Sequence, residues 1–264
     1  MQKIIDFHTH VFPDKIAQKA VYSISDFYSF PRERAFKGNI EELVSLAKSA
    51  GVDYVVTCST ATTKKQVESI NTWIATLKSD TVFPLGTLHP EYSDIEGEVE
   101  RIIALGLYGI KLHPDFQEFN IDDEKAENIY KIVGDRLPIL IHTGDTNLDY
   151  SAPKKLAKMA DKYPNVRFIA PHLGGYSRWD EVTKYLIDKN VWFDTSSALE
   201  FMEPERATEI ILKHGCDKVF FGTDYPLCSQ ADALLRFNKL ALTESQKNDI
   251  LFNNVNSFLN LNIK

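Results

Sequence analysis

The chain has 264 residues, of which 44% are hydrophobic and 25% charged, so it holds enough apolar side chains for a large core. A net charge of −7 argues against a basic face for nucleic acid or an anionic membrane, and we expect a small-molecule partner instead. Three widely spaced cysteines do not make a disulfide framework, and no apolar run of about 18 residues could span a bilayer. The first predicted strand begins near Lys3, which leaves no room for an export signal, so we expect a cytoplasmic protein.

Eight short apolar runs alternate with amphipathic segments along the chain. The runs cover residues 3–8, 53–58, 81–87, 108–112, 138–142, 166–170, 191–195 and 218–222. Several of them, such as 139–141, are apolar on both faces, as expected of parallel strands that are covered on both sides. Between the first two runs, Ile40, Leu43 and Ala47 follow a helical spacing. The pattern predicts one α/β domain over residues 1–264, a (β/α)8 TIM barrel.

The segment 11–38 departs from this pattern, because about 28 residues separate the first strand from the first amphipathic helix. Such a connection is far longer than usual. The segment carries several aromatic side chains together with Arg32 and Arg34. We expect a lid insertion that covers an apolar or aromatic acid, and the alternative is an extra helix packed over the barrel mouth.

Metal-binding side chains recur at the ends of the predicted strands. The chain opens with Asp6-Phe7-His8-Thr9-His10, and because side chains on a strand alternate faces, both histidines point the same way and can bind one cation. Later strand ends supply further candidates, namely Lys111, His113, His142, His172 and Asp224. The carboxyl ends of barrel strands face one shared pocket, so these side chains are predicted to converge there.

Five ordered motifs carry a resemblance to a known family. They are Asp6-Phe7-His8-Thr9-His10, Gly109-Ile110-Lys111-Leu112-His113-Pro114, Ile141-His142-Thr143-Gly144, Pro171-His172-Leu173-Gly174-Gly175 and Phe221-Gly222-Thr223-Asp224-Tyr225-Pro226. The motifs follow one another at barrel intervals over nearly the whole chain. In this the sequence resembles the metal-dependent amidohydrolase superfamily, specifically amidohydrolase family 2.

The resemblance implies a divalent metal, commonly zinc, held by His8, His10, His142 and Asp224. Nitrogen ligands with a carboxylate suit Zn²⁺, and an open position leaves room for water or substrate. The resemblance also implies catalytic roles for Asp224, as ligand and as the base that takes a proton from metal-bound water, and for His172, which polarises the substrate or shuttles the proton.

Lys111 bears on the number of metals. Binuclear members of the superfamily carry a carboxylated lysine at this strand end, which bridges two ions and leaves the second to His142 and His172. The competing view keeps Lys111 as a catalytic ammonium that binds a substrate carboxylate or pairs with Asp224. We favour one metal per chain, because two would require the lysine to be modified. The candidate substrate-binding residues are Lys111, His113 and Arg178.

Several functional readings stay open. The lead is a metal-dependent hydrolase of a small amide, lactone or ester that uses a metal-activated water. The alternative is a nonoxidative decarboxylase, a carbon–carbon lyase, of an aromatic or related carboxylic acid. A nuclease fits the acidic balance poorly, and an intact Asp224 argues against a non-catalytic barrel. A homo-oligomer is also left open, since no exposed stripe identifies an interface.

Overall fold

The computed structural model describes residues 2–264 and arranges its strands in a parallel ring. The strands are β1 (Ile5–His10), β2 (Tyr54–Cys58), β3 (Val82–Pro84), β4 (Gly86–Thr87), β5 (Ile110–Leu112), β6 (Ile139–Ile141), β7 (Phe168–Ala170), β8 (Val191–Asp194) and β9 (Val219–Phe220). Neighbours in chain order pair in parallel from β1 to β3 and from β4 to β9. Each predicted run overlaps a strand, and the run 81–87 supplies both β3 and β4.

Backbone hydrogen bonds at two junctions complete the ring. Next to the break between β3 and β4, the Leu85 amide donates to the Thr57 carbonyl oxygen at 2.8 Å. Between the last strand and the first, the Phe7 amide donates to the Phe221 carbonyl oxygen at 2.8 Å, and the Asp224 amide donates to the His8 carbonyl oxygen at 2.8 Å. The predicted (β/α)8 barrel is therefore confirmed, with β3 and β4 acting as one strand.

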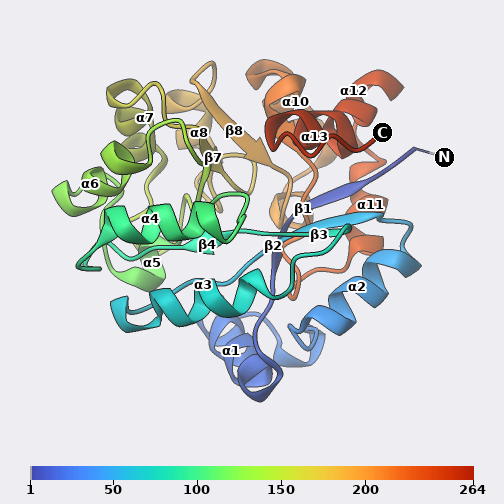
Figure 1. Cartoon of the computed structure of the whole chain (residues 1–264). Helices are drawn as coiled ribbons and strands as arrows, with labels where there is room; N and C mark the ends of the chain where they lie inside the picture. Colours follow the sequence, from blue (N-terminus) through green and yellow to red (C-terminus); the bar gives the residue numbers. More distant parts are fainter. Residues whose placement is uncertain (1) are drawn as a thin grey trace.

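Most of the helices surround the strands on the outside of the ring (Figure 1). They are α1 (Asp14–Phe27), α2 (Ile40–Ser49), α3 (Val67–Ala75), α4 (Ile95–Ala104), α5 (Pro114–Gln117), α6 (Glu124–Val133), α7 (Pro153–Lys162), α8 (Trp179–Tyr185), α9 (Ala198–Phe201), α10 (Pro204–His214), α11 (Gln230–Phe237), α12 (Glu244–Asn248) and α13 (Asn254–Phe258). Three short 3₁₀ helices, η1 (Arg32–Arg34), η2 (Lys64–Gln66) and η3 (Cys216–Lys218), and one π-helix, η4 (Asp249–Asn253), complete the helical elements. Within residues 2–264, none of the helices has the length and apolar character needed to cross a membrane.

Two apolar clusters form most of the core. The larger one joins strand residues such as Ile110, Ile139 and Phe168 to the helices packed outside them. A second cluster collects Leu140, Ile169 and other residues from strands around the ring, so it fills the barrel interior. Burying one such side chain contributes about 1.5–3 kcal/mol. The interior is thus apolar at one end, which leaves the polar strand ends to line the other.

The segment 11–38 forms α1 and η1, and α1 stands apart from the ring at the bottom of Figure 1. Phe27, at the end of α1, packs edge-on against Phe116 of α5 at a ring distance of 4.7 Å. At the other end of the segment, Gly38 adopts φ +75°, and a Cβ there would lie 2.5 Å from Val21 Cγ2. Only glycine fits here, because the backbone has a positive φ angle and passes close to a side chain of α1. That the segment is a lid stays a prediction.

Candidate metal centre

The predicted strand-end residues come together at one end of the barrel. His8 and His10 lie on β1, and Lys111 lies on β5. His113 and His142 directly follow β5 and β6, whereas His172 and Asp224 lie in the loops that follow β7 and β9. His8, Lys111, His142 and His172 are all nearly or fully buried. His172 and Asp224 have positive φ angles of 61° and 69°. Such backbone conformations cost about 1–3 kcal/mol each in a residue other than glycine and cluster at functional sites.

Three atoms that could bind a metal approach one another at the end of β1. Nε2 of His8 and Nε2 of His10 lie 3.1 Å apart. Oδ1 of Asp224 lies 3.3 Å from Nε2 of His10 and 3.8 Å from Nε2 of His8. Lys111 Nζ lies 3.1 Å from the same nitrogen of His8. Two imidazole nitrogens and a carboxylate oxygen thus face one small space.

A second pair of imidazoles lies beside the first. Nε2 of His172 is 3.2 Å from Nδ1 of His142, and the ring centroids of His172 and His8 are 5.5 Å apart. Both His142 and His172 border a pocket, as does Asp224. The structure therefore brings five of the predicted residues, His8, His10, His142, His172 and Asp224, into one connected group.

The outward nitrogen of each imidazole has its own acceptor. Nδ1 of His8 donates to Asp194 Oδ2 at 2.9 Å, Nδ1 of His172 to the Ser196 carbonyl oxygen at 2.9 Å, and Nε2 of His142 to the Gly144 carbonyl oxygen at 2.9 Å. Nδ1 of His10 faces Cys58 Sγ at 3.4 Å. In neutral imidazole one nitrogen carries the proton and the other a lone pair. These contacts leave the lone pairs directed inward, which fits a divalent cation.

Burial keeps most of these imidazoles neutral. Burial lowers the pKa of His8 to about 4 and also lowers the pKa values of His142 and His172. Burial acts to lower the pKa of His10 too, but the neighbouring Cys58 and Asp224 outweigh it and raise this pKa to about 9. His10 therefore carries a proton on Nε2, the nitrogen that faces Asp224. A bound cation would replace this proton.

Asp224 and Lys111 set the remaining charge. Burial alone would raise the pKa of Asp224, but the neighbouring histidines hold it well below its usual range, so Asp224 is a carboxylate at neutral pH. Burial lowers the pKa of Lys111. Neutral nitrogen donors next to one buried carboxylate form the kind of site that holds a divalent metal.

A cavity of about 160 Å³ opens beside His142, His172 and Asp224. Its walls include four aromatic side chains, Tyr28, Phe30, Tyr176 and Phe201. Arg34 and Glu200 also line it and form an ion pair at 2.9 Å. A cavity of about 150 Å³ accepts a benzene ring. A larger groove of about 610 Å³ between α8 and α10 contains none of the site side chains.

None of the three predicted substrate-binding residues, Lys111, His113 and Arg178, is among the residues that line this cavity. The His113 ring stacks between Phe116 and His142, with centroid distances of 3.8 and 4.1 Å, and its Nε2 contacts the Tyr28 hydroxyl at 3.1 Å. Arg178 begins α8 and pairs with Glu181 and Asp149. Neither residue lines the cavity, and Arg34 is the arginine that does.

Tyr28 and Cys58 contact the candidate site, although the signal for them in the sequence was weak. The Tyr28 hydroxyl lies 3.4 Å from Nε2 of His142, although the two residues are far apart in the chain. Tyr28 was one of several aromatic residues in the segment 11–38, and the sequence did not single it out. Cys58 ends a predicted strand, as the metal-binding candidates do, and that position was the signal that could have found it.

Comparison with protein families identifies a match over nearly the whole chain. The sequence model of the family described as Amidohydrolase matches residues 5–260. No curated protein matches the chain.

Solved structures show the same fold at low sequence identity. The chain is similar to 5-carboxyvanillate decarboxylase from Sphingomonas paucimobilis, with a TM-score of 0.77 and 16% identity over 98% of this chain and 99% of that one. It is also similar to a dihydroxybenzoic acid decarboxylase from Polaromonas sp. JS666 with bound manganese and the inhibitor 2-nitroresorcinol, with a TM-score of 0.74 and 16% identity over 100% and 98%. A 2,6-dihydroxybenzoate decarboxylase from Rhizobium gives a TM-score of 0.74 and 14% identity over 100% of both chains.

These comparisons correct the lead functional prediction. The sequence was interpreted as a hydrolase of an amide, lactone or ester, whereas these three similar structures are decarboxylases. The prediction of a hydrolase is therefore wrong, and the alternative reading agrees with the comparisons. The error has a physical reason, because a metal site on a barrel can polarise a carboxylate as well as a water, and the ligand motifs do not separate the two. A divalent metal is supported, and zinc in particular is not.

Proposed function

The chain belongs to the amidohydrolase family, and on this premise we propose that it is a metal-dependent nonoxidative decarboxylase of a small aromatic carboxylic acid. The observation that carries the proposal is the 160 Å³ aromatic cavity directly beside the cluster of inward-facing imidazoles. Its volume is close to that of a cavity that accepts a benzene ring. The aromatic walls favour an aromatic ring through edge-on and offset contacts.

The proposed ligands of one divalent ion are His8, His10, His142 and Asp224. Their inward lone pairs and the buried Asp224 carboxylate support this set, and three imidazoles with one carboxylate suit zinc. Manganese is the ion in the Polaromonas enzyme. We propose one ion per chain, because two ions would require a modified Lys111 to bridge them. The Lys111 Nζ lies 3.1 Å from His8 Nε2. The bound ion would supply positive charge for the substrate oxygens.

The reaction breaks the bond between the ring carbon and its carboxylate. The electron pair of that bond stays on the ring carbon, carbon dioxide leaves, and the ring carbon takes one proton. We assign delivery of the proton to His172, whose Nδ1 is fixed by the Ser196 carbonyl oxygen while the ring borders the cavity. Asp224 also borders the cavity and is held as a carboxylate, so it can accept a proton from solvent and relay it to Nε2 of His172.

Arg34 is the proposed contact for an anionic group of the substrate. It is the one arginine or lysine among the residues described around the cavity, and its partner Glu200 lies on the same wall. Because the Arg34 side chain is 56% exposed, the ion pair is weak and a substrate carboxylate can compete with Glu200. The tyrosines and the histidines supply hydrogen-bonding groups for ring hydroxyls.

A substrate panel tests the proposal. Metal-loaded protein is incubated with benzoic acids that differ in the number and position of hydroxyl and methoxy groups, and the products are separated by chromatography. We expect at least one acid to be converted to the corresponding phenol, with full loss of turnover after chelation and recovery with added metal. The His172→Gln variant should bind metal as the wild type does but lose turnover. Metal-loaded protein that converts none of the acids would contradict the proposal.

A further inference from the structure

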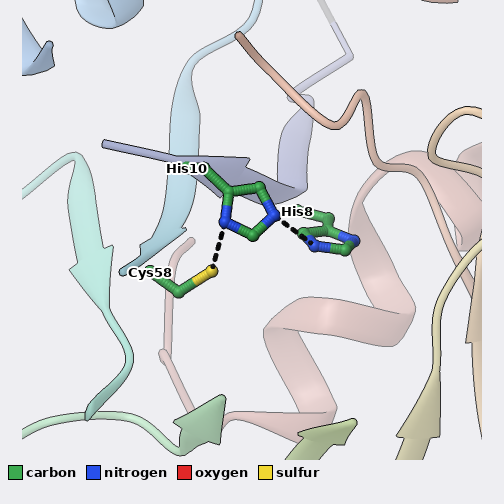
Figure 2. A group of neighbouring side chains, drawn as sticks. All are labelled: His8, His10 and Cys58. Atoms are coloured by element: carbon green, nitrogen blue, oxygen red, sulfur yellow. Dashed lines mark hydrogen bonds between the residues drawn. The ribbon is translucent and has the colours of Figure 1, made fainter. Parts of the chain in front are cut away.

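Cys58 meets the His10 ring on the side opposite His8. Figure 2 shows Nδ1 of His10 directed at Cys58 Sγ, at 3.4 Å, and Nε2 of the same ring directed at His8, at 3.1 Å. The two nitrogens of an imidazole point away from each other. One ion therefore cannot be bound by Nε2 of His10 and by Cys58 together, although His8, His10 and Cys58 form a close group of metal-binding side chains.

Strand pairing fixes the position of the thiol. His10 and Cys58 are register partners where β1 and β2 run in parallel, so their side chains start from adjacent points. The Cys58 S–H donates to the Thr9 carbonyl oxygen at 3.4 Å, and the residue is 1% exposed. With its proton directed at Thr9, the sulfur presents a lone pair to the Nδ1–H of His10.

We propose that Cys58 is a positioning residue that holds His10 in the tautomer with a proton on Nδ1, so that Nε2 offers its lone pair to the metal. The inference rests on the proposed ligand set of the previous subsection. It assigns to sulfur the role that Asp194, the Ser196 carbonyl oxygen and the Gly144 carbonyl oxygen have for the other three imidazoles. Sulfur is a weaker acceptor than oxygen. His10 is therefore the ligand whose orientation depends on the weakest of the four contacts.

Two substitutions separate the hydrogen bond from packing. Cys58→Ser keeps a donor and an acceptor, whereas Cys58→Val keeps an apolar side chain in the buried site and removes both. Dissociation constants for Co²⁺ and Mn²⁺ are measured by competition with a chelator. We expect about 10–100-fold weaker binding by Cys58→Val, the usual effect of losing a group that orients a metal ligand, and nearly full rescue by Cys58→Ser. Cys216→Ser, at a cysteine outside the site, is the control and should bind as the wild type does.

Two spectroscopic measurements test the role without relying on activity. The Co²⁺-loaded wild type should show no intense near-ultraviolet band from sulfur-to-cobalt charge transfer, because the thiol is not a ligand. Nitrogen-15 NMR of labelled histidine in the Zn²⁺-loaded protein should show a proton on Nδ1 of His10 and none on Nε2. A charge-transfer band, or an Nδ1 without a proton, would overturn the inference even if Cys58→Val failed to fold.

The His10→Ala variant distinguishes failure of this inference from failure of the proposed site. If His10→Ala binds metal as tightly as the wild type, the ligand set itself is wrong and the inference falls with it. If His10→Ala loses the metal while folded Cys58→Val retains wild-type affinity, the ligand set stands and the role of Cys58 is refuted. Weaker binding by both variants, with rescue by Cys58→Ser, is the result that supports it.

Discussion

Asp194 accepts a hydrogen bond from Nδ1 of His8 at 2.9 Å, and neither side chain is exposed to solvent. The other carboxylate oxygen accepts from the backbone amides of His172 and Ser196. One buried carboxylate at the end of β8 thus orients His8 and also fixes the backbone around His172. Asp194 thus connects a proposed metal ligand, His8, to the proposed proton donor, His172.

Replacing Asp194 by asparagine should weaken metal binding by about 10–100-fold, because an amide accepts less strongly from Nδ1 of His8. Titration calorimetry with Zn²⁺ and Mn²⁺ measures the change. Glu98→Gln is the control, since the Glu98 carboxylate is also buried but pairs with Arg101 and Asn71 outside the site. Equal affinities for Asp194→Asn and Glu98→Gln would show that the His8 contact does not orient a ligand.

Arg34→Ala should raise KM for an acidic substrate by about tenfold and leave kcat nearly unchanged. The reason is that Arg34 lines the cavity but lies at its exposed edge, where a charge-assisted contact is worth roughly 1–2 kcal/mol. Steady-state kinetics with the acid of the panel that is converted fastest measures both constants. Arg32→Ala is the control, because Arg32 has a similar exposure and pairs with Asp26 away from the cavity. Similar KM values for both variants would remove Arg34 from substrate binding.

Metal removal should lower the thermal stability of the protein. A ligand that binds only the folded state at 100 times its Kd contributes about 2.7 kcal/mol, which corresponds to a shift in Tm of roughly 5–10 °C in a chain of this size. Differential scanning fluorimetry of chelated and metal-loaded protein measures the shift. His10→Ala should show little or none. A wild-type Tm that does not respond to Zn²⁺ or Mn²⁺ would argue against the site.

His214 should make the protein less stable as the pH falls from 7 to 4. Burial lowers its pKa to about 4, while an exposed histidine has a pKa of about 6.5. Between these values the unfolded chain binds more protons than the folded chain, so the stability present above pH 6.5 is lost as the pH falls. The ring cannot escape easily, because it stacks on Phe193 at 3.7 Å and donates to the Val191 carbonyl oxygen.

The His214→Gln variant isolates this effect. Between pH 7 and pH 4, the free energy of unfolding of this variant should fall by on the order of 3 kcal/mol less than that of the wild type, because glutamine does not titrate. Urea unfolding of both proteins at three pH values, with chelator present, measures the difference. Other buried groups titrate equally in the two proteins. Parallel pH profiles would mean that His214 is not held neutral.

The sequence was sufficient to predict the barrel and the group of residues at its mouth. Alternating apolar runs locate the strands, and parallel strands all end at the same side of the ring, so His8, His142 and Asp224 had to come near one another. The direction of each imidazole nitrogen was not predictable. It depends on acceptors such as the Gly144 carbonyl oxygen, which only the folded backbone places.

The cavity was harder to predict, because its walls come from connections and not from strands. The path of segment 11–38 brings Tyr28 and Arg34 to the cavity, and no periodicity in the sequence encodes that path. Arg178 was a reasonable candidate from its place after the glycine pair, but Glu181 and Asp149 bind its guanidinium. The reaction was also ambiguous, because the ligand motifs are compatible with a hydrolase and with a decarboxylase.

The most direct test follows both the carboxyl group and the proton. Metal-loaded protein is incubated in D₂O with hydroxybenzoic acids that carry carbon-13 in the carboxyl group, and the products are examined by NMR and mass spectrometry. We expect equal amounts of labelled carbon dioxide and of a phenol that carries one deuterium at the ring carbon that lost the carboxyl group. Neither product should form after chelation. If the labelled carboxyl group stays attached to the ring of every acid while the protein holds its metal, the chain is not the decarboxylase proposed.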